Sequence, residues 1–211
     1  MNPAAETDQT IFTIGHSNHP QDAFVARLVH HGVTALADVR STPRSRFNPQ
    51  FNREELSRTL SHNDIRYVFL GRELGGRSDD DACYEQGRIR YERVALTARF
   101  QSGLARLLEG AKAHRIALMC AEGEPLVCHR TLLVAHALDG LGTSVQHILA
   151  DGSLESHGET MNRLLTQFGM NPEDDLASNR AESIAAAIAH QASQVAYIRP
   201  STKAKSELQT S

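Results

Sequence analysis

Short apolar runs recur along the chain, each bounded by glycine, proline, asparagine or charged residues. Runs of this length, rich in Ile, Val and Leu, are typical of β-strands rather than of helices. The pattern predicts strands over residues 11–15, 33–39, 65–70, 116–120 and 145–149. Polar or turn-forming residues follow each run, so the strands are expected to end there.

The segments between these runs place apolar residues at helical spacing. One apolar stripe, which Gly32 can end, is formed by Phe24, Val25, Leu28 and Val29. Asn52 precedes a second helix as an N-cap, with Glu55 three residues further on. Two more helices are predicted over 93–113 and 131–141, the first with a core face of Leu96, Phe100, Leu104 and Leu107. Residues 71–93 have no clear period and are expected to be irregular.

The alternation of strands and helices predicts an α/β fold with a mostly parallel sheet and helices on both faces, a three-layer sandwich. We expect a flexible N-terminus over 1–10 and one α/β domain over 11–170. Residues 171–211 are predicted to hold a connector at 171–179, an Ala-rich helix at 181–191 and a polar tail from 201.

Composition narrows the class of protein. The chain has 211 residues, of which 40% are hydrophobic and 22% charged, as in soluble globular proteins. The net charge of −3 argues against a generally basic nucleic-acid binder. Three cysteines make a poor disulfide framework and favour a reducing compartment, and no signal sequence or membrane span is evident. A cytoplasmic protein without a membrane partner is therefore expected, and the oligomeric state stays open.

Polar side chains gather where three of the predicted strands end. His16 and Ser17 follow the first strand, Asp38 and Arg40 close the second, and Cys120 is the last residue of the fourth. In open parallel sheets, ligands bind outside the carboxyl ends of the strands. The convergence therefore predicts a site at this edge of the sheet. Asp38 stands in an otherwise apolar strand and needs a partner, for which Arg40, two residues on and on the same face, is a candidate.

The loop after the second strand is rich in arginine. It carries Arg40, Arg44 and Arg46 and no carboxylate between residues 40 and 49. Guanidinium groups bind phosphate or carboxylate through paired hydrogen bonds. The alternative interpretation is a solvated basic loop at the surface. Because the loop adjoins the edge of the sheet, anion binding and this alternative are about equally favoured.

The turn after the fourth strand holds the densest group of reactive side chains. It contains Cys120, Glu122 and the tripeptide Cys128-His129-Arg130. Three interpretations are open: a cysteine nucleophile with His129 or His16 as its base, a metal site at Cys120, Cys128 and His129 completed by Glu122 or His16, or an anion site at the start of the next helix. The spacing is not Cys-x-x-Cys, so the metal signal is weak, and Cys120 alone is better explained as a small buried strand residue.

Several motifs in fixed order resemble the family of domains of unknown function numbered 488. They are Thr13-Ile14-Gly15-His16-Ser17, Asp38-Val39-Arg40-Ser41 with Pro43 and Ser45, Leu70-Gly71 with Glu73-Leu74-Gly75-Gly76, Cys120-Ala121-Glu122, and Cys128-His129-Arg130. The likeness extends from about residue 11 to residue 165. It implies the fold and the location of a site, but no catalytic assignment, and the cofactor stays unknown.

The leading hypothesis from the sequence is an enzyme, a hydrolase or transferase, that acts on a phosphate-bearing or nucleotide-like substrate. Predicted catalytic residues are His16, Asp38, Glu122, Cys128 and His129. Predicted anion-binding residues are Ser17, Arg40, Arg44, Arg46 and Arg130. Two alternatives are a non-catalytic module that binds nucleic acid or a nucleotide, and a metal or redox protein that uses Cys120, Cys128 and His129.

Overall fold

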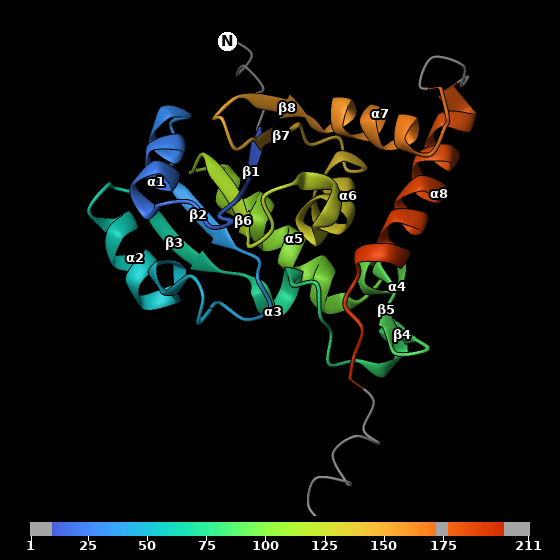
Figure 1. Cartoon of the computed structure of the whole chain (residues 1–211), viewed down its shortest axis with the longest axis horizontal. Helices are drawn as coiled ribbons and strands as arrows, with labels where there is room; N and C mark the ends of the chain where they lie inside the picture. Colours follow the sequence, from blue (N-terminus) through green and yellow to red (C-terminus); the bar gives the residue numbers. More distant parts are fainter. Residues whose placement is uncertain (1–9, 172–176, 201–211) are drawn as a thin grey trace, which may run out of the picture.

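Six strands form the central sheet of the computed structural model, which describes residues 10–171 and 177–200 (Figure 1). The strands are β1 (Ile11–Gly15), β2 (Ala35–Asp38), β3 (Arg66–Phe69), β6 (Ile116–Cys120), β7 (Val145–Ile148) and β8 (Leu154–Ser156). Their order across the sheet is β3-β2-β6-β1-β7-β8, with all pairs parallel except β7–β8. The predicted mostly parallel sheet is confirmed.

Helices cover both faces of this sheet and complete the predicted three layers (Figure 1). On one face lie α1 (Gln21–His30) and α2 (Arg53–Ser61), with the short η1 (Pro49–Phe51). The other face is covered by α4 (Tyr91–Ala95), α5 (Ala98–Ala111), the π-helical η4 (Arg130–Ala135), α6 (His136–Asp139), α7 (His157–Gln167) and α8 (Ala177–Val195). Short elements link these layers: α3 (Gly71–Leu74), η2 (Asp81–Cys83), η3 (Pro125–Val127) and a hairpin of β4 (Tyr84–Glu85) and β5 (Arg88–Ile89).

The period of two along each strand divides the core between these layers. In β1, Phe12 and Ile14 pack with α1 and α2, whereas Ile11 packs with the helices of the opposite face. In β6, Ala117 and Met119 face α1 and α2, and the alternate residues Ile116, Leu118 and Cys120 face the other way. Cys120 therefore points toward the layer that contains η4, which is the layer that brings Cys128 and His129 back to the sheet.

The strand register sets three chain ends side by side. Gly15 at the end of β1 pairs with Cys120 at the end of β6, and Met119 pairs with Asp38 at the end of β2. The chains continue in step beyond the strands, because the His16 amide donates to the Cys120 carbonyl at 3.0 Å. The predicted convergence of polar groups at the carboxyl edge thus has its structural basis in the parallel register.

Two helix predictions need correction. The single helix predicted over 93–113 is broken between α4 and α5, where the Thr97 side chain caps α5 by accepting from the Phe100 amide at 3.2 Å. Leu96 lies at this break and is 84% exposed, so its assignment to the core is wrong. Asn52 does precede α2, but its side chain accepts from the Ser45 amide at 2.7 Å and does not cap the helix.

Residues 177–200 contain a helix that packs against the main core. The Ala-rich helix is confirmed as α8, which is longer than predicted and buries Ala187, Ile188 and Ala192 against the main core. The predicted flexible N-terminus and polar tail lie outside the described residues, except for Thr10, as does most of the predicted connector. No described helix combines the length and the apolar character that crossing a bilayer requires.

Candidate functional site

A pocket of about 470 Å³ opens at the carboxyl ends of β2 and β6. Its floor contains Cys120, Glu122 and His129, and Arg40 contributes to one wall. The outer part is lined by Arg44 and Arg77 and by Tyr197 of the segment that follows α8. The volume falls in the range of small-molecule sites, and polar groups of both charges converge on it.

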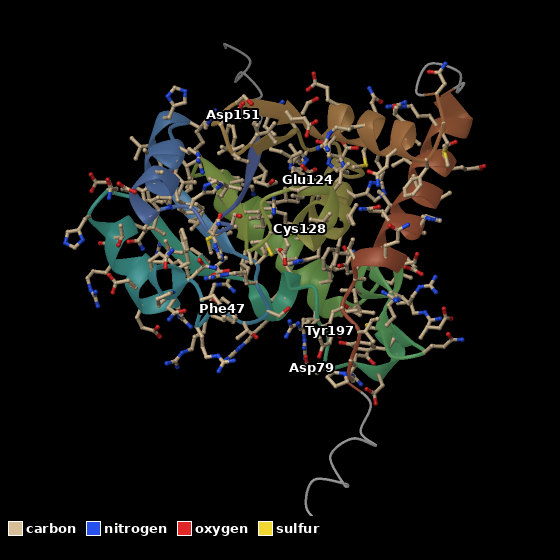
Figure 2. The ribbon with its side chains drawn as sticks, viewed as in Figure 1. Phe47, Asp79, Glu124, Cys128, Asp151 and Tyr197 are labelled. Carbon is tan, nitrogen blue, oxygen red and sulfur yellow. The ribbon has the colours of Figure 1, made fainter. Side chains whose placement is uncertain are left out.

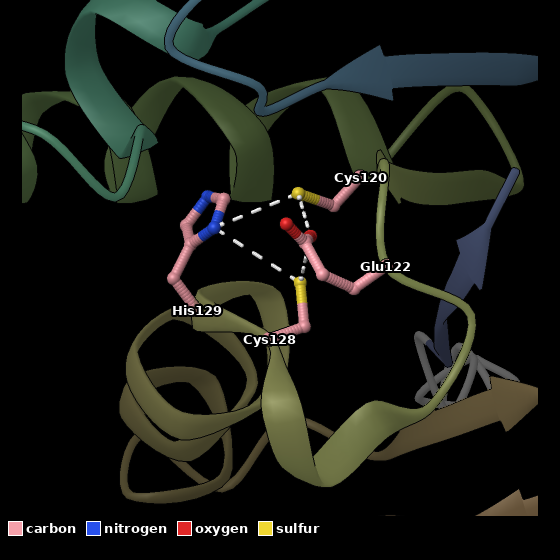
Figure 3. A group of neighbouring side chains, drawn as sticks. All are labelled: Cys120, Glu122, Cys128 and His129. Carbon is pink, nitrogen blue, oxygen red and sulfur yellow. Dashed lines mark hydrogen bonds between the residues drawn. The ribbon is translucent and has the colours of Figure 1, made fainter. Parts of the chain in front are cut away.

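The floor holds four side chains whose donor atoms face one another (Figure 3). The Cys120 and Cys128 thiols donate to the same oxygen of Glu122, Oε2, at 3.0 and 3.1 Å. The Nδ1 atom of His129 lies 3.6 Å from the Cys120 sulfur and 4.0 Å from the Cys128 sulfur. Both sulfurs and the imidazole are buried, whereas Glu122 is exposed on the pocket side. Cys120 is thus part of a polar cluster and is not simply a small apolar strand residue.

The surroundings of this cluster shift the pKa values of the two thiols in opposite directions. Burial raises the pKa of Cys120 well above its usual value, and the nearby Cys128 and Glu122 add to this. Burial also acts to raise the pKa of Cys128, but the hydrogen bond with Cys120 and the charges of Arg130 and His129 lower it well below the ordinary value. The pKa of His129 is raised in spite of burial, because Cys128 and Glu122 favour its charged form. Proton sharing of this kind is typical of functional sites.

His129 is held from two sides. Its second ring nitrogen, Nε2, donates to the carbonyl of Val39 at 3.0 Å, which turns Nδ1 toward the sulfurs. Gly76 packs against the ring so closely that a Cβ atom at that position would lie 2.8 Å from the ring Cγ. The Gly75-Gly76 motif therefore has a steric role at the site, and a larger residue would displace the imidazole.

Asp38 and Arg40 form the predicted ion pair, which is confirmed and fully enclosed. The guanidinium donates to Asp38 through Nε at 2.9 Å and Nη2 at 2.6 Å, and Nη2 also donates to the Phe51 carbonyl at 2.8 Å. The Tyr67 hydroxyl donates to the same carboxylate at 2.7 Å. Arg40 is 5% exposed, so its side chain is largely committed to Asp38 although it contributes to the pocket wall.

His16 lies behind Arg40 rather than in the pocket lining. Its Nδ1 donates to the Ser17 carbonyl at 2.8 Å, and its Nε2 is 3.3 Å from Nη1 of Arg40, while the ring stacks on Phe51. Burial, aided by the charge of Arg40, lowers the pKa of His16 to about 4. The imidazole is therefore neutral near pH 7 and accepts a hydrogen bond from the guanidinium.

Arg130 has a different place from the one predicted. It is fully buried, and its two terminal nitrogens donate to the carbonyls of Glu122 and Gly123, the latter at 2.8 Å. The side chain thus fixes the turn that carries Glu122 and does not reach the pocket. The prediction that Arg130 contacts the bound anion is corrected for this reason.

Of the other predicted anion ligands, some line the pocket and some do not. Arg44 lines the pocket, whereas Arg46 and Ser17 lie outside its lining. Sequence reasoning did not assign Arg77 and Tyr197 to the site. Tyr197, labelled in Figure 2, stacks on the Arg77 guanidinium at 4.3 Å. Its carbonyl accepts from the Ile89 amide at 3.0 Å, which fastens the C-terminal segment to the hairpin. No local pattern in the sequence indicates this contact, because it joins segments far apart in the chain.

The fold and the site together define an α/β protein with a polar pocket above a cluster of two buried cysteines, a buried histidine and an exposed glutamate. Residues 20–137, more than half of the chain, match the family model described as Domain of unknown function DUF488. The chain belongs to this family, as the motifs predicted. Comparison with the curated proteins and with the solved structures found no match.

Proposed function

We propose that the protein is an enzyme, a hydrolase or transferase, that acts on a small phosphate-bearing substrate in this pocket. The observation that carries the proposal is the position of Arg44 and Arg77. Both line the same pocket as Glu122 and His129, and among the described residues neither forms an ion pair. Two guanidinium groups that lack a carboxylate partner and line the same pocket suit a substrate that carries its negative charge at one end.

The role proposed for each pocket residue follows from how far its side chain is buried. Arg44 and Arg77 bind the phosphate group, and Arg40, neutralised by its ion pair with Asp38, forms part of the pocket wall. Glu122 is the exposed carboxylate on the floor, so it serves as the general base or acid. His129 and the thiols lie beneath it and support the reaction either as a nucleophile with its base or as metal ligands.

A small-molecule substrate suits this site better than a nucleic acid. The pocket is confined to about 470 Å³, and the chain as a whole carries a net charge of −3, which does not favour binding of a long polyanion. Tyr197 and Tyr91 line the pocket and offer aromatic surface for a nucleotide-like group. The three free cysteines suit a reducing compartment, so we place the enzyme in the cytoplasm.

Ligand binding by the full chain tests the proposal. Calorimetry and thermal shift with inorganic phosphate, phosphomonoesters, mononucleotides and short oligonucleotides should identify a small phosphate ligand. Arg44→Ala and Arg77→Ala should each weaken its binding by about 10- to 100-fold, since a charge-assisted hydrogen bond contributes about 1.5–3 kcal/mol. Arg46→Ala, on the same loop as Arg44 but outside the pocket lining, is the matched control and should bind like the wild type.

Two results would contradict the proposal. One is binding that is equal in the Arg44, Arg77 and Arg46 variants. The other is binding of oligonucleotides alone, with steep salt dependence, which would identify a nucleic-acid-binding module instead. Once a ligand is found, Glu122→Gln should lower turnover of the corresponding ester by about 10²- to 10⁴-fold, the usual effect of losing a general acid or base.

A further inference from the structure

We propose that Cys120, Cys128, His129 and Glu122 form a zinc site at the floor of the pocket. One donor atom from each residue lies within 4.8 Å of all the others (Figure 3). The four come from the end of β6, the turn after it and the start of the following helix, so the fold itself brings them together. Two thiolates and an imidazole are ligands that favour zinc over hard cations such as magnesium.

The spacing between donors agrees with tetrahedral coordination. Bonds of about 2.3 Å to sulfur and about 2.0 Å to nitrogen place these donors roughly 3.6 Å apart at the tetrahedral angle. The His129 nitrogen is 3.6 and 4.0 Å from the two sulfurs. The Glu122 oxygen is closer, at 3.0 and 3.1 Å, and needs to move outward by a few tenths of an ångström. It is free to do so, because Glu122 is the exposed member of the group.

The groups around the cluster hold these donors as they would hold metal ligands. Metal-bound histidine usually donates its other ring N–H to a carbonyl or carboxylate, which fixes the ring. His129 does so with the Val39 carbonyl at 3.0 Å, and in the neutral ring this leaves the Nδ1 lone pair directed at the sulfurs. The Arg130 amide lies 3.4 Å from the Cys128 sulfur and points its N–H at it, as amides do with metal-bound thiolates.

The charges around the cluster are compatible with zinc. Arg130 is fully buried, and no carboxylate pairs with it among the described residues; its partners are backbone carbonyls. A buried cation of this kind needs a nearby negative charge. Zinc with two thiolates, one carboxylate and a neutral imidazole carries a net charge of −1, the same as the Glu122 carboxylate beside two neutral thiols. The negative charge near this guanidinium is therefore kept when zinc binds.

The arrangement is that of a catalytic rather than a purely structural centre. Catalytic zinc sites have three protein ligands and a fourth position open to water or substrate. Here the three interior ligands are buried, and the fourth position, on the pocket side, is occupied by a carboxylate that can be displaced. As a catalytic centre the site rests on the function proposed above, whereas metal binding itself is measured without any phosphate ligand.

Metal analysis of the full chain, purified without chelators, is the test. The wild type should contain about one zinc ion per chain, or take it up from added zinc chloride. Cobalt added in its place should give the thiolate-to-metal absorption of a tetrahedral site. Cys120→Ser, Cys128→Ser and His129→Ala should each lose the metal, and Glu122→Gln should keep it. Cys83→Ser is the matched control, since Cys83 is also buried and free but lies outside the cluster.

Wild-type protein that takes up neither zinc nor cobalt would overturn the proposal, even if every variant failed to fold. Zinc retained equally by Cys128→Ser and Cys83→Ser would also overturn it. Loss of two titratable thiols without metal would identify a disulfide between Cys120 and Cys128 instead. None of these metal measurements involves phosphate, so they are independent of the proposed function. A protein that binds no metal but still binds a phosphomonoester through Arg44 would refute the zinc site and leave the proposed function standing.

Discussion

Gly76 and His129 are in direct contact, although more than fifty positions separate them in the sequence. A Cβ atom at residue 76 would lie 2.8 Å from the ring Cγ and 3.0 Å from Nδ1, the atom that faces the two sulfurs. The glycine thus decides where the imidazole sits. Close approach of this kind transmits any change in the residue 71–77 segment directly to the floor of the pocket.

Gly76→Ala should therefore displace His129 and strain the site. We expect a loss of about 1–3 kcal/mol in the free energy of unfolding, as for other overpacked positions, and weaker binding of cobalt or zinc. Urea denaturation and metal titration measure the two effects. Gly158→Ala is the control, because a Cβ atom there meets nothing within 4 Å and alanine is a better helix former in α7. Equal stability of the two variants would contradict the steric argument.

Asp38→Asn should be among the most destabilising single changes in the chain. It leaves the Arg40 guanidinium buried without its counter-charge, and removing one partner of such a pair usually costs about 3–5 kcal/mol. Chemical denaturation gives the value. The exposed pair Glu55–Arg58 provides the comparison, since Glu55→Gln should change the free energy of unfolding by less than about 1 kcal/mol. A similar cost for both variants would show that Asp38 does not hold Arg40.

Arg130→Met should lower stability and affect ligand binding only through it. The change removes the hydrogen bonds to the carbonyls of Glu122 and Gly123 inside the protein, at a cost on the order of 3 kcal/mol. Arg44→Ala should weaken ligand binding directly. Its free energy of unfolding should stay within about 0.5 kcal/mol of the wild-type value, because Arg44 is exposed. Thermal melts with and without the phosphate ligand distinguish the two. An unchanged melting temperature in Arg130→Met would contradict the assigned role.

Stability should fall as the pH falls from about 6.5 to about 4, through His157 and His147. The two rings share a hydrogen bond of 3.2 Å between His147 Nε2 and His157 Nδ1, and His147 Nδ1 is 2.7 Å from the Thr13 hydroxyl oxygen. Burial lowers the pKa of His157 to about 4 and that of His147 well below its usual value. In the unfolded chain both titrate near 6.5. Below that pH the unfolded state binds more protons, so acid favours unfolding.

For each of these histidines, the free energy of unfolding should change by up to about 1.4 kcal/mol per pH unit between pH 6.5 and the folded pKa. Above about pH 6.5 this pH dependence should be absent. Neighbouring charges modify it: Asp139 raises the pKa of His157, and His136 lowers it. Urea denaturation at a series of pH values should give a smaller slope for His157→Gln than for the wild type. His62→Gln, at an exposed position, should keep the wild-type slope. No difference between the two variants would refute the assignment.

The sequence predicts most of the fold because its signals are local. The central strands β1, β2 and β6 are short, mostly apolar runs, and the parallel arrangement then places their carboxyl ends together. The break before α5 escaped prediction although Thr97 is a good N-cap residue, because the apolar period runs through it. The edge strand β8 and the β4–β5 hairpin are only two or three residues long, too short to give a pattern.

The candidate site was predictable in its location but not in its contacts. Asp38 and Arg40 could be paired from the sequence because they are neighbours on one strand. The contact of Gly76 with His129 and that of Arg77 with Tyr197 join distant segments, so no spacing rule indicates them. The sequence places Arg130 at an anion site because it stands at the start of a helix. Its burial against the carbonyls of Glu122 and Gly123 is a tertiary contact that the local pattern does not indicate.

The C-terminal segment contributes pocket-lining residues that lie outside the family match. The family match ends at residue 137, yet Tyr197 and Val195 line the pocket, and the segment is fastened by its bridge to the hairpin at Arg88. The floor and the arginines of the wall therefore lie within the matched region, whereas Val195 and Tyr197 lie outside it. Changes in the C-terminal segment can thus reshape one side of the pocket without altering Cys120, Glu122 or His129 on its floor.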